Sequence, residues 1–158
     1  MRSSTFKSSF TLIELIVCLG IVGIISAVTL PYCWGAYRSV EAKTTTRIVA
    51  SILRSTKEMA IAQGKKYEII FTPSNSNLDI EVYTNLSDPN PLKVGKTEKI
   101  SLSSSYSFNV TFHNDKAIFT SFGTSNGGSV YITDTSNNKG YRISVLSTSG
   151  RVKVLALD

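Results

Sequence analysis

The sequence has 158 residues, of which 42% are hydrophobic, and it carries a formal net charge of +6 at pH 7. This apolar content excludes an intrinsically disordered chain, and the length fits one globular domain with an additional segment. The positive charge favours contact with acidic surfaces, anionic lipid or nucleic acid, but does not require any of them.

A long uncharged segment dominates the N-terminal part of the chain. Residues 15–37 contain no charged side chain. As a helix they would measure about 35 Å, and a bilayer core is about 30 Å thick. We therefore expect residues 10–37 to form a membrane-spanning helix. The alternative is a secretory signal peptide with Arg2 and Lys7 as its basic part, although the apolar core of such peptides is usually about 7–15 residues.

Glu14 is the unusual residue of this region, because it lies between apolar neighbours. A carboxylate at the centre of a membrane costs about 3 kcal/mol and usually has a partner. Cleavage of the chain before Phe10 would create an α-amino group one helical turn from Glu14, and the helix dipole also favours a carboxylate there. The resulting ion pair could form within one chain or between neighbours. The alternative is a glutamate that extends to the membrane edge.

The residues around Glu14 carry a resemblance to a known family. Residues 8–14, Ser-Ser-Phe-Thr-Leu-Ile-Glu, and the apolar run after them resemble the class III signal sequence of type IV pilins and type II secretion pseudopilins. The resemblance implies that a prepilin peptidase removes residues 1–9 by cutting between Ser9 and Phe10, that Phe10 is then N-methylated, and that Glu14 aligns subunits through a neighbour's terminal amine. It also implies that the helix kinks at Pro31 during assembly. Ser9 stands where the family almost always has glycine.

Residues 38–64 are expected to form the amphipathic second half of the same helix. Apolar residues recur at helical spacing, and charged residues lie on another face. Gly64 is a typical helix end. One helix is thus predicted from Phe10 to Gln63. Its apolar stripe, predicted to pack on the domain, comprises Ile48, Val49, Ile52, Leu53, Met59 and Ala60.

Residues 65–158 alternate between short apolar runs and loops rich in Ser, Asn and Gly, which predicts an antiparallel β domain of about seven strands. The predicted strands are Tyr67–Thr72, Leu78–Tyr83, Ser107–His113, Ala117–Thr120, Val130–Thr133, Tyr141–Leu146 and Val152–Ala156. Packed against the helix, they would give a pilin-like α+β fold.

Four short motifs near the C-terminus carry a second resemblance. They lie at residues 119–123 (Phe-Thr-Ser-Phe-Gly), 128–132 (Gly-Ser-Val-Tyr-Ile), 141–145 (Tyr-Arg-Ile-Ser-Val) and 150–154 (Gly-Arg-Val-Lys-Val). Their spacing resembles the GspH/FimT group of minor pseudopilins and minor pilins, whereas about residues 72–116 are uninformative.

This resemblance implies a minor pseudopilin at or near the tip of a type II secretion pseudopilus. Its partners would be prepilin peptidase and other pilin or pseudopilin subunits. It would cross the inner membrane once, with residues 65–158 in the periplasm. The alternative is a FimT-like type IV minor pilin that acts in pilus biogenesis or binds DNA during uptake.

The candidate DNA-binding residues are Lys139, Arg142, Arg151 and Lys153, near the C-terminal hairpin. Some FimT-like minor pilins bind DNA through positive C-terminal regions, and contacts with phosphates would make such binding salt-sensitive. The alternative is an ordinary solvated charged face.

No catalytic or metal-binding pattern is found in the sequence. The single histidine, His113, falls in a predicted strand without partners at suggestive spacing. We therefore expect no cofactor and no enzymatic activity. A membrane-anchored enzyme or tethered domain is a third hypothesis, and it predicts that Met1 is retained.

Overall fold

The computed structural model describes residues 11–86 and 89–157, and the side chains of residues 31–36 and 38 are not described. The predicted cleavage site, Ser9 and Phe10, therefore lies outside the described residues. The chain divides into two compact units, Met1–Arg38 and Ser39–Asp158. We describe each unit by itself.

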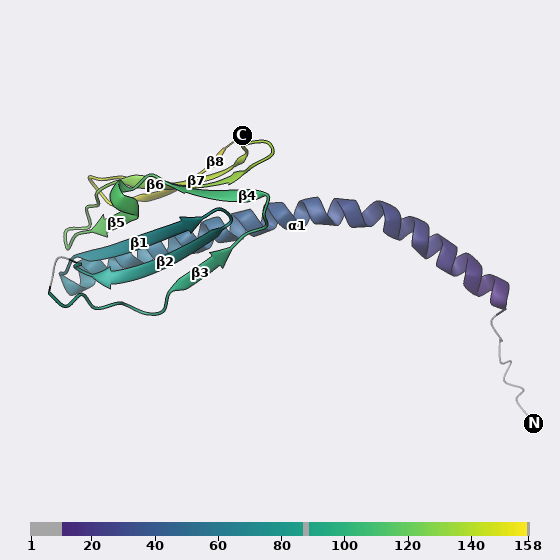
Figure 1. Ribbon diagram of the computed structural model, residues 1–158, viewed down its shortest axis with the longest axis horizontal. Helices are drawn as coiled ribbons and strands as arrows, with labels where there is room; N and C mark the ends of the chain where they lie inside the picture. Colours follow the sequence, from purple (N-terminus) through teal and green to yellow (C-terminus); the bar gives the residue numbers. More distant parts are fainter. Residues whose placement is uncertain (1–10, 87–88, 158) are drawn as a thin grey trace, which may run out of the picture. The chain divides into compact units, whose positions relative to one another are not determined.

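One helix, α1 (Leu12–Gln63), runs from the first unit into the second (Figure 1). It ends as predicted, because Gly64 follows with a φ of 63°. The amide of Lys65 donates to the carbonyl of Ala60 (3.2 Å) and the amide of Gly64 to that of Ile61 (3.3 Å). These two bonds form a Schellman motif, in which a residue in the left-handed conformation closes the helix.

The strands of the second unit form two antiparallel sheets. Among the described residues the strand orders are β3-β2-β1-β5 and β4-β6-β7-β8. The strands are β1 (Tyr67–Ser74), β2 (Asn77–Thr84), β3 (Glu98–Ser101), β4 (Tyr106–Val110), β5 (Lys116–Phe119), β6 (Gly128–Asp134), β7 (Gly140–Val145) and β8 (Val152–Leu157). The predicted α+β pilin-like fold is confirmed.

Two details of the strand prediction were wrong. The described chain has eight strands. The missed strand is β3, whose sequence Glu-Lys-Ile-Ser lacks the apolar alternation that identifies the others. His113 does not lie in a strand. It begins a short 3-10 turn, η1 (His113–Asp115), in which Asn114 has a φ of 53° that a strand cannot accommodate.

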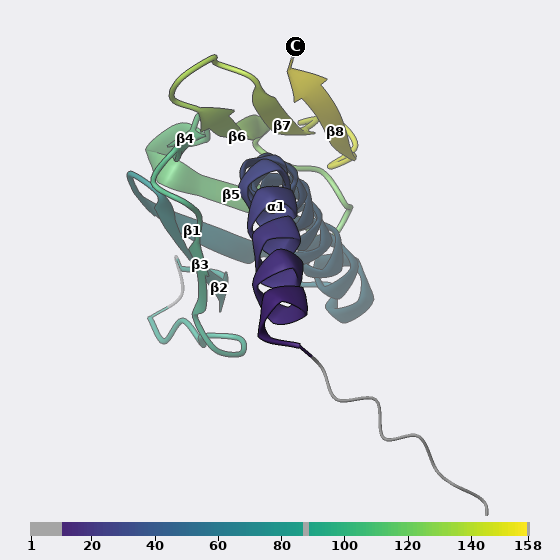
Figure 2. The ribbon, with the colours of Figure 1, turned by 90° about the vertical axis from the view of Figure 1, so that its right-hand side faces the viewer.

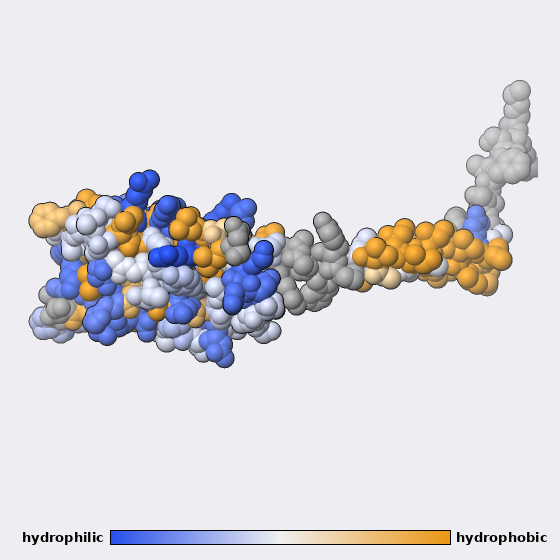
Figure 3. Space-filling model, turned by 90° about the horizontal axis from the view of Figure 1, so that it is seen from above, coloured by the Kyte–Doolittle hydropathy of each residue, from blue (hydrophilic) through white to orange (hydrophobic). Residues whose placement is uncertain are grey.

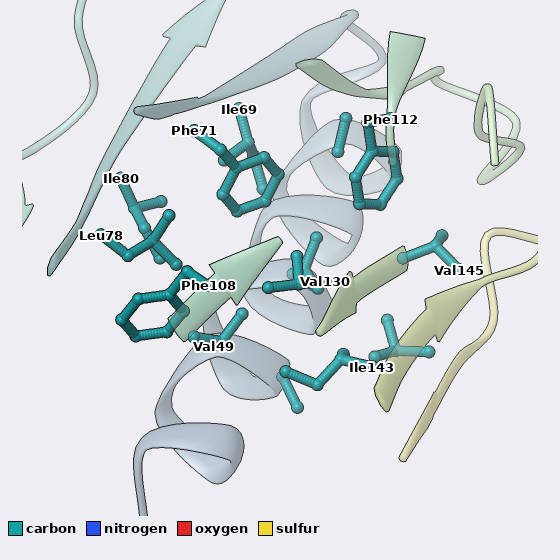
Figure 4. Close-up of a cluster of buried hydrophobic side chains, with 14 of the residues drawn as sticks. Val49, Ile69, Phe71, Leu78, Ile80, Phe108, Phe112, Val130, Ile143 and Val145 are labelled. Atoms are coloured by element: carbon teal, nitrogen blue, oxygen red, sulfur yellow. The ribbon is translucent and has the colours of Figure 1, made fainter. Parts of the chain in front are cut away.

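The core of the second unit lies between the sheets and the buried stripe of α1 (Figure 4). Val49, Leu53 and Ala60 are fully buried, as the helical spacing predicts, and Ile52 and Met59 are partly buried. Ile48 was placed wrongly in this stripe, because 42% of it is exposed. The buried face of the helix therefore differs from the prediction: it leaves out Ile48 and also includes Ala42, Ala50, Thr46 and Thr56.

These two threonines do not leave unpaired hydroxyls in the core. Thr46 Oγ1 donates to the carbonyl of Ala42 (2.7 Å) and Thr56 Oγ1 to that of Ile52 (2.8 Å). Both bonds stay within the helix, so neither buried hydroxyl lacks a hydrogen-bond partner.

Candidate functional site

The first part of α1 is apolar on every face and exposed. Leu12–Leu30 has a mean hydropathy of 2.5, is long enough to cross a membrane, and is 0% buried. Its large apolar side chains are exposed by 54% or more, up to 79% at Leu12. Figure 3 shows these residues as a continuous apolar surface. Exposed apolar surface of this extent marks a membrane or protein interaction site.

The hydroxyl groups in this segment bond within the helix. Ser26 Oγ donates to the carbonyl of Val22 at 2.7 Å. Thr29 Oγ1 donates to the carbonyl of Ile25 at 3.0 Å. Since neither hydroxyl needs an outside partner, both residues are compatible with a lipid surrounding.

Glu14 lies in the first turn of α1 and bonds to Thr11. The amide of Glu14 donates to Thr11 Oγ1 (3.3 Å). In return the amide and hydroxyl of Thr11 donate to Glu14 Oε2 (3.5 and 3.4 Å). This reciprocal pair is a capping box, which satisfies two amides at the start of the helix.

Sequence reasoning missed this role, although its signal, Thr-x-x-Glu before an apolar run, is present in the sequence. Glu14 therefore has a partner within its own chain. Its predicted pairing with a terminal amine stays a prediction. So does the kink at Pro31, through which α1 continues without interruption.

The structure separates the four candidate DNA-binding residues. Arg142 on β7 and Lys153 on β8 share the outer face of the second sheet, because the alternate residues Ile143 and Val145 of β7 are buried. Lys139 precedes β7 and Arg151 follows it, so they lie at opposite ends of this strand. Arg142 and Lys153 therefore lie on one face of the second sheet.

Arg142 is held on this surface by contacts with two side chains. Its guanidinium carbon lies 5.5 Å from the ring centroid of Tyr131, its partner in register on β6. Its Nε donates to Ser129 Oγ (3.2 Å), which bonds in turn with Ser144 Oγ (3.0 Å). Sequence reasoning found no aromatic partner here, because the pairing of Tyr131 with Arg142 depends on strand register.

Arg151 belongs to a second cationic surface, which the sequence did not predict. With Arg54, Lys57 and Glu58 of α1 it lines an open cavity of about 450 Å³, so three cations and one carboxylate line it. Nearby, Phe122 is 91% exposed next to Gly123, where a Cβ would lie 3.0 Å from Ile61 Cδ1 of α1. A hydrogen bond from the amide of Ser125 to the carbonyl of Ser147 ties this loop to the turn before Arg151.

The described residues contain no group of three His, Cys, Asp or Glu side chains that could hold a metal ion. His113 is exposed in η1.

The chain is similar to proteins of bacterial filaments. No family model matches the sequence. A fimbrial protein of Pseudomonas aeruginosa is 35% identical over 77 residues, which is 47% of each chain. The chain thus spans about half the length of the curated relatives that it matches.

Solved structures share most of the fold. The minor pseudopilin EpsH from the type II secretion system of Vibrio cholerae has a TM-score of 0.59 at 16% identity, covering 73% of this chain and 97% of EpsH. The type IV minor pilin FimU of Pseudomonas aeruginosa has a TM-score of 0.57 at 16% identity, covering 75% and 93%. GspH of Escherichia coli has a TM-score of 0.53 at 13% identity, covering 75% and 89%.

Proposed function

We propose that this chain, which has the fold of minor pseudopilins and type IV minor pilins, is a pilin-type filament subunit with a structural rather than a catalytic role. The observation that carries the proposal is the exposed apolar segment Leu12–Leu30, at the start of the helix whose later part packs on the sheets. A helix that is apolar on all faces is stable only in a membrane or among other apolar helices.

The two surroundings correspond to the subunit before and after its assembly into a filament. Before assembly the segment would hold the chain in the inner membrane, with residues 65–158 in the periplasm. Prepilin peptidase would cut between Ser9 and Phe10, and Phe10 would be N-methylated. In the filament the same segment would pack against those of other pilin or pseudopilin subunits.

The more specific form of the proposal is a minor pseudopilin of a type II secretion system, at or near the pseudopilus tip. The fold likeness to EpsH and GspH supports it. Loss of secretion in a deletion strain that still forms type IV pili would be expected. Loss of pili with normal secretion would instead favour a type IV minor pilin.

Glu14 provides the sharpest test of assembly, because its two roles can be separated. Glu14→Gln keeps a side chain that can complete the capping box but removes the charge. Thr11→Ala keeps the charge but removes the cap, at a cost of about 1 kcal/mol in helix stability. If the charge aligns subunits, Glu14→Gln abolishes incorporation into filaments and Thr11→Ala reduces it only slightly.

Incorporation can be measured by cross-linking the subunit to its filament neighbours in sheared filament fractions. N-terminal sequencing of the same material establishes whether the mature chain begins at Phe10. Normal incorporation of Glu14→Gln would contradict the alignment role, and a chain that retains Met1 would contradict the processing step.

DNA binding by a FimT-like minor pilin is the second candidate function. The observation in its favour is the surface formed by Arg142, Tyr131 and Lys153 on the outer face of the second sheet. A guanidinium that lies over a phenol ring brings together the charge and the aromatic surface that nucleic-acid sites use.

The test is fluorescence anisotropy of the full chain in detergent with duplex DNA at increasing salt. Arg142→Gln and Lys153→Gln together should lower the slope of log affinity against log salt by about 2, since each phosphate contact contributes about 0.9. Lys99→Gln, on the first sheet and 75% exposed, is the matched control. An unchanged slope in the double variant would exclude this surface.

A further inference from the structure

The edges of the two sheets differ in how they are protected. An edge strand presents unpaired amides and carbonyls that can pair with another chain, and proteins usually cover or interrupt such edges. The edge of β5 is covered by Asn126. Its side chain accepts a hydrogen bond from the amide of Ile118 (3.0 Å) and donates to the carbonyl of Lys116 (2.7 Å), in place of a further strand.

Two more edges are protected in other ways. On β4 the amide of Phe108 donates to the carbonyl of Asn75 (3.0 Å) and that of Tyr106 to Ser103 (2.9 Å), so the turn after β1 and the loop before β4 close this edge. The edge strand β3 is only four residues long and includes Glu98 and Lys99. Short, charged strands are poor templates for pairing.

Within the part of the chain that the structure describes, the edge strand β8 is less protected, because no side chain or loop bonds to its outer edge and it is two residues longer than β3. It has six residues, Val-Lys-Val-Leu-Ala-Leu, with Lys153 as its one charged residue. Val154 and Leu155 are 39% and 38% exposed. Figures 1 and 2 show β8 as the outermost strand of the second sheet, beside β7 alone.

The register identifies which groups of β8 point outward. The amide of Leu146 donates to the carbonyl of Arg151, one residue pair beyond the ladder that joins Val145 to Val152. Hydrogen-bonded pairs alternate along an antiparallel ladder, so Lys153, Leu155 and Leu157 bond to β7. The amides and carbonyls of Val152, Val154 and Ala156 point away from it and have no hydrogen bond to the described residues.

The charge of the outer face limits what can pair there. Arg142 and Lys153 lie on this face, together with Tyr131 and Leu155. The outward-facing residues of β6, β7 and β8 within Ser129–Thr133, Arg142–Ser144 and Lys153–Leu157 include no carboxylate. A strand added beside β8 would place a side chain about 5 Å from Lys153, so a carboxylate there would be stabilised.

We propose that the free edge of β8 binds an extended segment of another protein chain, in which carboxylate side chains alternate with apolar ones. Its backbone would pair with Val152, Val154 and Ala156. Its carboxylates would face Lys153 and Arg142. This mode of recognition, β-strand addition, takes its affinity from backbone bonds and its specificity from alternate side chains.

A second copy of this chain fits the edge less well. Antiparallel pairing of two β8 strands about Val154 would satisfy the outward backbone groups. However, it would place the two Lys153 side chains on the same face as diagonal neighbours, about 7–8 Å apart. The arginines of both copies would lie on that face as well. Like charges so placed are destabilising, whereas an acidic strand reverses the sign of the interaction.

The test uses the full chain in detergent micelles and two labelled seven-residue peptides, one of alternating valine and glutamate and one of alternating valine and lysine. Fluorescence anisotropy should show at least tenfold tighter binding of the glutamate peptide. Val154→Pro should weaken that binding at least tenfold, because proline removes an outward amide. The bonds to β7 are unaffected, and proline is tolerated on edge strands in this orientation.

Lys153→Glu is the second variant, since it keeps the strand and reverses the charge. It should bind the lysine peptide more tightly than the glutamate peptide. The proposal is overturned if Val154→Pro binds as the unmodified chain does while Lys153→Glu leaves the preference unchanged, or if neither peptide binds at millimolar concentration. It is also overturned if sedimentation shows that the unmodified chain dimerises and Val154→Pro does not, because a second copy then occupies the edge. The peptide assay does not depend on whether α1 assembles into a filament.

Discussion

The two parts of α1 show how one continuous helix can be adapted to two surroundings. In Leu12–Leu30 apolar side chains cover every face and remain exposed. After Ser39, the apolar residues narrow to a stripe that the sheets bury, with Val49 and Leu53 at 0% exposure. The backbone conformation is the same in both parts. The distribution of side chains around the axis therefore determines whether the helix packs on its own domain or needs an apolar surrounding from outside.

The largest effect is expected from a substitution in the part of α1 that packs on the sheets. Leu53→Ala removes a fully buried side chain from the core and should lower the free energy of unfolding by about 3 kcal/mol. The matched variant Leu19→Ala changes an exposed residue and should leave that quantity within about 0.5 kcal/mol. Urea denaturation of both variants measures the difference. Equal destabilisation would show that the two parts of α1 do not differ as described.

An intermediate effect is expected from a charged substitution in the exposed apolar part of α1. Ile21→Lys places a charge in the middle of Leu12–Leu30 and should oppose membrane insertion by about 3 kcal/mol. The melting of the second unit should not change, because Ile21 lies outside it. Carbonate extraction of membranes measures the inserted fraction. Arg54→Lys, at an exposed position of the second part, is the control and should leave insertion unchanged.

The smallest expected effect concerns a surface ion pair in the second unit. Lys93 lies against the carboxylate of Glu81, and Thr97 and Tyr83 also donate to it. Lys93 chiefly lowers the pKa of Glu81 from 4.5 to about 2. A lowered folded-state pKa gives stability that is present above the unfolded value. This contribution should be full above about pH 5 and disappear as the pH falls through about 2.

Glu81→Gln isolates that contribution. The melting temperature of the variant should be slightly lower at neutral pH, and the two curves should converge toward about pH 2. Glu98→Gln, exposed on β3, is the control. A difference that persists unchanged at low pH would mean that the carboxylate of Glu81 is not stabilised in the folded state.

Much of the fold could be predicted from the sequence because its signals are local. The end of α1 follows from Gly64, and most strands follow from short apolar runs bounded by loops. The strand β3 could not be found, because its four residues pair with β2 without an apolar pattern of their own. His113 was assigned to a strand because its neighbours Val110 and Phe112 are apolar, although the chain turns after Phe112.

The candidate site was less predictable, because it depends on which residues the fold brings together. Lys139 and Arg151 are close to Arg142 in sequence, yet they lie at opposite ends of β7. Tyr131 is distant in sequence but lies opposite Arg142 through strand register. The capping box is the exception, because Thr11 and Glu14 form a local pair whose spacing can be read from the sequence.

The internal bonds of Ser26 and Thr29 have a consequence for the exchange of surroundings. A segment whose hydroxyls already bond to its own carbonyls keeps the same bonds in lipid and among other helices. Lipid tails and apolar side chains are also nearly equivalent as solvents. Moving this segment between the two should therefore be close to neutral in free energy, and reversible. If the chain is a filament subunit as proposed, the direction of that exchange would be set elsewhere, at the charged start of the helix and on the surfaces of the folded unit.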